Sequence, residues 1–263
     1  MINIDNYAYA SKLKRKNPME KVAFALLTLG VCLWGNSILL SLVVLLIMTW
    51  LSVRKGGIPL RFFLKLMLLP MSFLILGVLM IAFQISNDPQ QFVMSVPVFG
   101  TFLGFSKIGI ETAAQLFFRA LGAVSCLYYL SLNTPMVDLL SVLRKLKCPK
   151  ILVELMSLIY RFIFVLMETA ETMYTAQNSR LGYSSLKAGY HSLGALASTL
   201  FIRAYKRSDE IFTAMEARGY DGDIEVLEEL APFSWQGFLP AVLINMILIG
   251  SVLLGRQYIG GLL

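Results

Sequence analysis

The chain has 263 residues, of which 57% are hydrophobic and only 15% are charged, and its formal net charge is +7. Soluble globular domains usually carry about 25% charged residues, so this composition favours a membrane protein over a soluble one. The positive charge alone would fit binding to nucleic acid or to anionic lipid, and the placement of the basic residues decides between the two.

Five apolar runs are close to the length of about 20 residues that crosses the hydrocarbon core of a bilayer. Only Gly35-Asn36, a tight-turn signal, separates the first two runs, which together predict a short transmembrane hairpin. The third run contains Pro70, which a membrane helix tolerates because neighbouring helices can satisfy the freed backbone groups. The expected spans are 22–34, 37–53, 60–85, 108–130 and 238–254.

The basic residues are distributed unevenly about these runs. Apart from Lys107, Arg119 and Arg256, they precede the first run, lie between the second and third, or fall between the fourth and fifth. If the runs alternate across the membrane, these segments share one side, which the positive-inside rule makes cytoplasmic. The sequence therefore predicts a multi-pass membrane protein with a cytoplasmic N-terminus, whose charge requires no nucleic acid. Segment 86–105, with Asp88 as its only charge, is expected to be an extracytoplasmic loop or a re-entrant segment.

The segment between the fourth and fifth runs is too long for an ordinary loop, and beyond Met167 it is too polar for lipid. It opens with a short amphipathic helix, which Thr134 can cap, with Pro135 in its first turn and Asp138 near the positive end of its dipole. Two long helical stretches follow, at 151–180 and 184–218. We therefore expect an all-α integral membrane protein in three parts: the N-terminal tail and four spans (1–133), a cytoplasmic platform (134–232), and the last span with the C-terminal tail (233–263).

The two long stretches end in the same pattern. Thr175-Ala176-x-x-x-Arg180 aligns with Thr213-Ala214-x-x-x-Arg218, and a glycine and a tyrosine follow each arginine almost at once. The arginines fall in the last helical turn, where the glycine suits a left-handed C-terminal cap. One cation there would be explained by its stabilisation of the helix dipole, about 0.3–1 kcal/mol. Two matched copies favour docking into carboxylate-bearing grooves, because guanidinium makes bidentate, charge-assisted hydrogen bonds.

With these paired arginines, the sequence resembles the transmembrane (T) component of energy-coupling-factor ABC transporters. The stretch IDNYAYASKLKRKNPMEK resembles the start of the cobalt-type, CbiQ-like members, which carry an Asp-x-Tyr-Ala element before a Pro-x-x-Lys segment. The segment from Thr134 to Lys147 resembles the first coupling helix of the family. The resemblance covers nearly the whole chain, and it identifies the two long helices as coupling helices.

The resemblance implies a non-catalytic subunit in the cell membrane of a prokaryote. It would link two CbiO-like ATPase subunits to a CbiM-like substrate-binding membrane subunit, with a small CbiN-like subunit as a further candidate partner. The implied cargo is cobalt, with nickel or a vitamin as the alternative, and ATP and Mg would bind to the ATPases, so no cofactor is expected in this chain. The implied ATPase contacts are Ser179-Arg180-Leu181, which departs from the family's Ala-Arg-Gly pattern, and Ala217-Arg218-Gly219. Candidate contacts for the membrane partners are Asp138, Leu139, Leu143 and Arg119.

The other reactive residues favour no catalytic or metal site. No GxxxxGK[ST] phosphate-binding loop occurs, and one histidine and three scattered cysteines give no metal-ligand spacing. His191 is interpreted as an interfacial or packed residue. Arg119 should face protein or water, as a structural pair with Glu111 or a contact to a partner, rather than act as a pathway residue. The alternatives are a membrane enzyme, which loss of activity on replacing His191 would favour, and a self-sufficient secondary transporter, which uptake by the chain alone would reveal.

Overall fold

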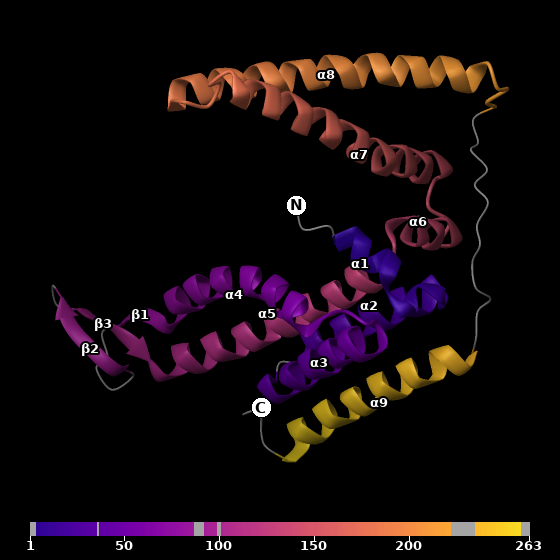
Figure 1. The fold of residues 1–263 in the computed structure, drawn as a ribbon. Coiled ribbons are helices and arrows are strands. Elements are labelled where there is room, and N and C mark those ends of the chain that lie inside the picture. Colours follow the sequence, from indigo (N-terminus) through magenta and orange to yellow (C-terminus); the bar gives the residue numbers. More distant parts are fainter. Residues whose placement is uncertain (1–3, 36, 87–91, 99–100, 222–234, 259–263) are drawn as a thin grey trace. The chain divides into compact units, whose positions relative to one another are not determined.

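The computed structural model describes residues 4–35, 37–86, 92–98, 101–221 and 235–258 (Figure 1). The chain divides into two compact units. The first combines Met1–Leu139 with Leu230–Leu263, and the second is Leu140–Glu229. Both units are helical, apart from one small sheet in the first.

The first unit contains the apolar helices. Four segments are long and apolar enough to cross a membrane, namely Pro18–Gly35, Ile38–Lys55, Leu60–Ala82 and Ile108–Asn133, which confirms four of the five predicted spans. The fifth is a helix whose described apolar part, Phe238–Leu253, is shorter than the other four. In chain order the helices are α1 (Ile4–Ala10), the 3-10 helix η1 (Lys12–Arg15), α2 (Pro18–Gly35), α3 (Ile38–Trp50), the π-helix η2 (Leu51–Lys55), α4 (Leu60–Ala82), α5 (Lys107–Asn133) and α9 (Trp235–Tyr258).

Helix α5 lies at the centre of this unit's core. One buried cluster joins α5 to α2, α3 and α9 through side chains such as Phe24, Val44, Cys126 and Val252, and a second joins it to α4. Gly122 permits this close packing, because an added Cβ would lie 2.9 Å from Cys32 Sγ and 3.1 Å from a backbone oxygen of α3. By contrast, α4 has a largely exposed apolar surface in this unit, as expected for a helix that faces lipid.

A three-stranded antiparallel sheet connects α4 to α5. Its strands are β1 (Phe83–Ser86), β2 (Phe92–Val98) and β3 (Thr101–Ser106), in the order β1-β3-β2, with Phe83 opposite Phe105 and Val98 opposite Thr101. The expectation of a loop or re-entrant segment at 86–105 is therefore wrong for the described residues, and the third span ends at Ala82 rather than at residue 85. The physical reason is that valine and phenylalanine, which are frequent here, favour strands. Asp88 lies outside the described residues.

The second unit is dominated by an antiparallel helical hairpin. Helix α6 (Met136–Lys145) leads into it from the first unit, and α7 (Lys150–Ser179) and α8 (Leu186–Glu216) form its arms. Figure 1 shows the two arms meeting where α7 ends and α8 begins. Within the described part of this unit, the only buried residues of α7 are Val153 and Glu154, and α8 has none. Shared apolar burial therefore contributes little to holding the arms together within the chain.

Candidate functional site

The first arginine lies in the turn that closes α7. The Arg180 N–H donates to the Gln177 carbonyl at 3.1 Å, the Leu181 N–H to the Asn178 carbonyl at 3.0 Å, and the Gly182 N–H to the Gln177 carbonyl at 2.9 Å. Leu181 has a φ of 61°. This combination of bonds with one left-handed residue is a Schellman motif, which satisfies carbonyls at the end of the helix.

The turn that closes α8 repeats this geometry 38 positions later. The Arg218 N–H donates to the Met215 carbonyl, the Gly219 N–H to the Glu216 carbonyl and the Tyr220 N–H to the Met215 carbonyl, each at 3.0 Å. Gly219 is the left-handed residue, with a φ of 78°. The two arginines therefore occupy equivalent backbone positions, immediately before the left-handed residue of each motif.

The glycine of the first turn has a different role from the one expected. Leu181, not Gly182, takes the left-handed conformation, so the expectation of a left-handed glycine is wrong for this copy. Gly182 is required for close packing instead, because an added Cβ would lie 2.7 Å from Ser192 Oγ and 2.9 Å from the Gln177 carbonyl oxygen. Leu181 therefore takes a conformation that costs non-glycine residues about 1–2 kcal/mol.

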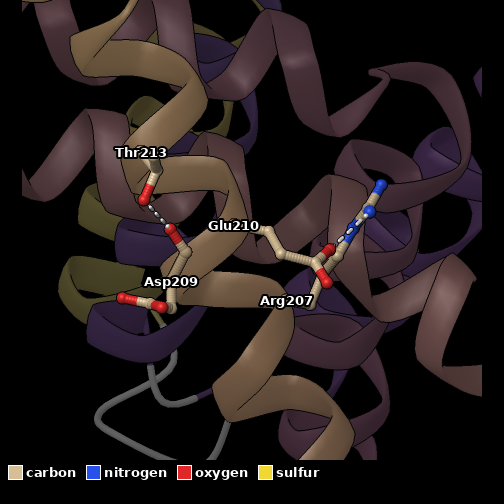
Figure 2. Close-up of polar contacts among 4 residues, drawn as sticks. All are labelled: Arg207, Asp209, Glu210 and Thr213. Atoms are coloured by element: carbon tan, nitrogen blue, oxygen red, sulfur yellow. Dashed lines mark hydrogen bonds and ion pairs between the residues drawn. The ribbon is translucent and has the colours of Figure 1, made fainter.

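The repeat also extends one to two turns into each helix. Thr175 Oγ1 donates to the Glu171 carbonyl at 2.8 Å, and Thr213 Oγ1 donates to the Asp209 carbonyl at 2.9 Å, as Figure 2 shows for the second pair. Both hydroxyls thus bond to the carbonyl one turn earlier, which keeps them within their own helix. The sequence alignment of the two helix ends is matched by equivalent local structure.

Both arginine side chains are exposed, and within the described part of the chain neither guanidinium forms a hydrogen bond or an ion pair. Arg207, nearby on α8, is different: it pairs with Glu210 at 3.0 Å on an open helix surface (Figure 2). Leu181 beside Arg180 is also 74% exposed. The two closing turns therefore present unpaired cations, and the first adds an apolar side chain.

A groove lies beside the second arginine, between the arms of the hairpin. Its volume is about 610 Å³. The lining is apolar where the arms face each other, through residues that include Leu158, Phe162 and Met215, and three arginines border it. They are Arg161, Arg207 and Arg218. An apolar lining with a cationic border suits a ligand that is apolar and carries carboxylates.

The candidate contacts on α6 are only partly accessible. Asp138, Leu139 and Leu143 are half-buried. Burial raises the pKa of Asp138, and the positive charge of Lys21 opposes that rise. Asp138 therefore already interacts with this chain's own lysine, which the sequence interpretation did not foresee.

Arg119 and His191 lie in different surroundings. Arg119 is half-buried in α5, and its backbone carbonyl accepts a weak hydrogen bond from Cys32 Sγ at 3.9 Å. His191 is exposed near the start of α8. The sequence interpretation had placed His191 at an interface or in a packed site, and within the chain itself no packing buries it.

A buried polar cluster that sequence reasoning missed fixes the end of α5. Lys21 is only 3% exposed, and its Nζ donates to the carbonyls of Asn133, at 3.0 Å, and Leu13, at 3.3 Å. Ser11 Oγ donates to Asn133 Oδ1 at 2.8 Å. These bonds hold the N-terminal segment and α2 against the point where α5 leads into α6. The available signal in the sequence was a lysine placed immediately before the first apolar run, 22–34.

Comparison with known proteins identifies a family. The family model CbiQ, a cobalt transport protein, matches residues 10–229 and so includes both arginine-bearing turns. The cobalt transport protein CbiQ of Salmonella typhimurium is 32% identical over 86% of this chain and 100% of its own length. A putative fused cobalt transport protein CbiMQ of Methanocorpusculum labreanum is 30% identical over 86% of this chain and 38% of its own. The energy-coupling factor transporter transmembrane protein EcfT of Exiguobacterium sibiricum is 27% identical over 81% of this chain and 82% of its own.

Proposed function

Because the chain belongs to the CbiQ family of cobalt transport proteins, we propose that it is the transmembrane energy-coupling subunit of an ATP-driven cobalt importer. In this proposal the chain is non-catalytic. ATP and Mg bind to two CbiO-like ATPase subunits, and cobalt binds to a CbiM-like membrane subunit, which a small CbiN-like subunit accompanies. A relative in which CbiM and CbiQ are fused supports the CbiM-like neighbour.

The single observation that carries the proposal is the pair of equivalent arginine-bearing turns. Each presents an exposed guanidinium immediately before a left-handed residue that ends a helix. Two equivalent cationic ends in one chain fit two equivalent, carboxylate-lined grooves, one on each of two ATPase subunits. The groove beside Arg218 adds an apolar surface that can receive the side chains of a docked ATPase segment.

The coupling step follows from this arrangement. When the two ATPase subunits bind ATP and approach each other, they displace the two ends of the hairpin. The arginines must bind more strongly in one nucleotide state than in another, since only a difference in affinity can shift a conformational equilibrium. Helix α6 then carries the displacement to the apolar helices of the first unit and to the CbiM-like subunit. We place the protein in the plasma membrane of a prokaryote, with the N-terminus and the hairpin in the cytoplasm, from the distribution of basic residues.

The proposal is tested by co-purifying the chain with its ATPase pair. Removing one partner of a buried ion pair costs about 3–5 kcal/mol, whereas an exposed pair contributes about 0.2–1 kcal/mol. The double variant Arg180→Glu/Arg218→Glu should therefore lose ATPase binding by about 100-fold or more, since 1.4 kcal/mol is a factor of ten. A matched control, Lys187→Glu/Lys206→Glu, reverses two exposed charges on α8 and should retain binding. Equal capture of the ATPases by both double variants would refute the docking role.

A further inference from the structure

A small cavity lies in the first unit, at the ends of its apolar helices. The beginnings of α2 and α9, the end of α5 and the π-helix η2 surround it, and its volume is about 110 Å³. Among the residues that line it, Lys16 and Lys55 are exposed, whereas Lys21 and Tyr129 are buried. The cavity therefore leads from the surface into the space between the helix ends.

Tyr129 brings a hydrogen-bond donor without a partner to this cavity. The residue is only 6% exposed, and its ring packs edge-on against that of Phe24, with 5.6 Å between the centroids. Within the described part of the chain its hydroxyl forms no hydrogen bond, and its oxygen is not one of the fully enclosed polar atoms. A buried tyrosine hydroxyl usually has a partner, because an unmade hydrogen bond costs free energy. A ligand in the cavity can supply the missing acceptor.

The lysines make the cavity cationic. Lys21 is 3% exposed, and its Nζ donates to two backbone carbonyls. An ammonium group has three N–H donors, so one remains beyond these two bonds. Lys16 and Lys55 add positive charge at the mouth, and Glu20 is the single acidic residue in the described lining. Three ammonium groups and one phenolic hydroxyl suit a small anion with several acceptor oxygens, such as a phosphate.

The cavity lies at the level of lipid headgroups. It adjoins the end of α3, where Trp50 is 54% exposed and the Lys55 Nζ lies 5.8 Å from the centroid of the Trp50 ring. Tryptophan and basic residues are enriched where the hydrocarbon of a membrane meets water. Basic pockets between membrane helices on the cytoplasmic side bind anionic headgroups. Sites that enclose a whole small molecule usually have volumes of about 300–1,000 Å³, so this cavity suits one end of a larger ligand.

An apolar surface leads away from the mouth of the cavity along α9. Pro240, which lines the cavity, shares one helix face with Leu243 and Ile247, because residues three and seven positions apart lie on the same side of a helix. Leu243 is 53% exposed and Ile247 is 69% exposed. An acyl chain can lie on this face, whereas a free phosphate has no use for it. The arrangement therefore favours a lipid over a soluble anion.

We propose that this cavity binds the phosphate of an anionic phospholipid. The phosphate accepts hydrogen bonds from the Tyr129 hydroxyl and the Lys21 ammonium group, and the charges of Lys16 and Lys55 hold it at the mouth. One acyl chain follows the exposed face of α9. The bound lipid thus links α2, α5, α9 and η2 at one end of the first unit. This inference requires only that the apolar helices span a membrane, so it does not depend on the ATPase partners.

Lipid binding is measured by native mass spectrometry of the purified full-length protein, freed of endogenous lipid in detergent and titrated with phosphatidylglycerol. The wild type should bind one lipid more tightly than any further ones. Lys16→Gln/Lys55→Gln should weaken that first binding about 25-fold, since each lysine near an anionic headgroup contributes about fivefold. The matched control, Lys12→Gln/Lys65→Gln, removes two exposed lysines outside the lining and should retain wild-type affinity. Equal affinity of the two double variants would overturn the proposal.

Tyr129→Phe separates a role in binding from a role in folding. It keeps the ring and removes a hydroxyl that has no partner within the described chain, so without lipid the variant should unfold at the wild-type temperature or above. Its affinity for phosphatidylglycerol should fall about tenfold or more, because the lost hydrogen bond is to a charged group. A lower unfolding temperature of the lipid-free variant, or an unchanged affinity, would refute the assignment of this hydroxyl to a ligand.

Thermal unfolding with three additives distinguishes the possible ligands. Phosphatidylglycerol should raise the unfolding temperature of the wild type, and Lys16→Gln/Lys55→Gln should lose most of that increase. Phosphatidylcholine, which carries the same phosphate beside a cationic group, and inorganic phosphate at the same phosphate concentration should each raise it less. An equal effect of inorganic phosphate would identify a site for free anions and refute the lipid. An equal effect of phosphatidylcholine would refute the requirement for an anionic headgroup.

Discussion

Gly219→Ala provides a sharp test of the second arginine-bearing turn. Gly219 has a φ of 78°, and an added Cβ would meet no heavy atom within 4 Å. Steric clash therefore contributes nothing, and the cost is the left-handed conformation alone, about 1–2 kcal/mol for a non-glycine residue. A cost of that size increases the open population of the turn about 5- to 30-fold. The arginine side chain would be unchanged, but it would spend more time outside the closed turn, which is the geometry that the proposed docking requires.

Amide hydrogen exchange measures this effect directly. The Tyr220 N–H donates to the Met215 carbonyl at 3.0 Å in the closed turn, so its protection should fall by the same 5- to 30-fold factor. The matched control is Gly194→Ala in the interior of α8, where an added Cβ also meets nothing within 4 Å. There alanine should stabilise the helix by about 1 kcal/mol. If Gly219→Ala preserves or increases the protection of Tyr220, as Gly194→Ala should, the argument from the backbone conformation is wrong.

Three further changes test other parts of the chain. Lys21→Ala should destabilise the first unit by about 2–4 kcal/mol, because two buried carbonyls lose a charged donor. Thermal unfolding of the full-length protein measures this loss of stability, and an unchanged midpoint temperature would contradict the prediction. Gly122→Ala should cost about 1–3 kcal/mol by overpacking against Cys32, whereas Gly77→Ala, with open space around its Cβ, should not destabilise the same protein. Leu181→Gly should stabilise the first turn by about 1 kcal/mol, seen as slower exchange of the turn's amides, and faster exchange would refute the assignment of strain.

The helical elements were predictable because their signals are local. Runs of apolar residues located the spans, and the basic residues helped to bound α6. The predicted cap of α6 is wrong, because Thr134 Oγ1 is buried without a hydrogen-bond partner in the described part of the chain. The left-handed Gly219 followed from its place after a helical pattern. The left-handed Leu181 could not be predicted in this way. The close approach of Ser192, on the next helix, to Gly182 is visible only in the structure. The sheet at 83–106 was missed because hydropathy does not separate a mixed loop from short paired strands.

The contacts that build the site could not be predicted, because they join distant parts of the chain. Tyr220 was visible only as part of an Arg-Gly-Tyr echo, and Glu154, to which its hydroxyl donates, is one of several acidic residues on α7. The bond between Lys21 and Asn133 spans 112 positions. A single sequence carries no signal that would pair such residues. The repeated helix end is visible in the sequence, so the two arginines could be predicted from it, whereas the contacts around them could not.

The hairpin combines equivalent turns with different attachments, and this asymmetry bears on coupling. The Arg180 turn is held by a network of three hydrogen bonds at the closed end, where α7 leads into α8, so a force applied there is carried into both arms. The Arg218 turn is attached to α7 by the Tyr220–Glu154 contact, beside a groove rather than a packed core. Because a helix is stiff along its axis and the arms share little buried surface, the open end is where the hairpin can change its angle. In the proposed coupling role, the two arginine-bearing turns would therefore respond differently to a displacement, with the first at the pivot of the hairpin and the second at its moving end.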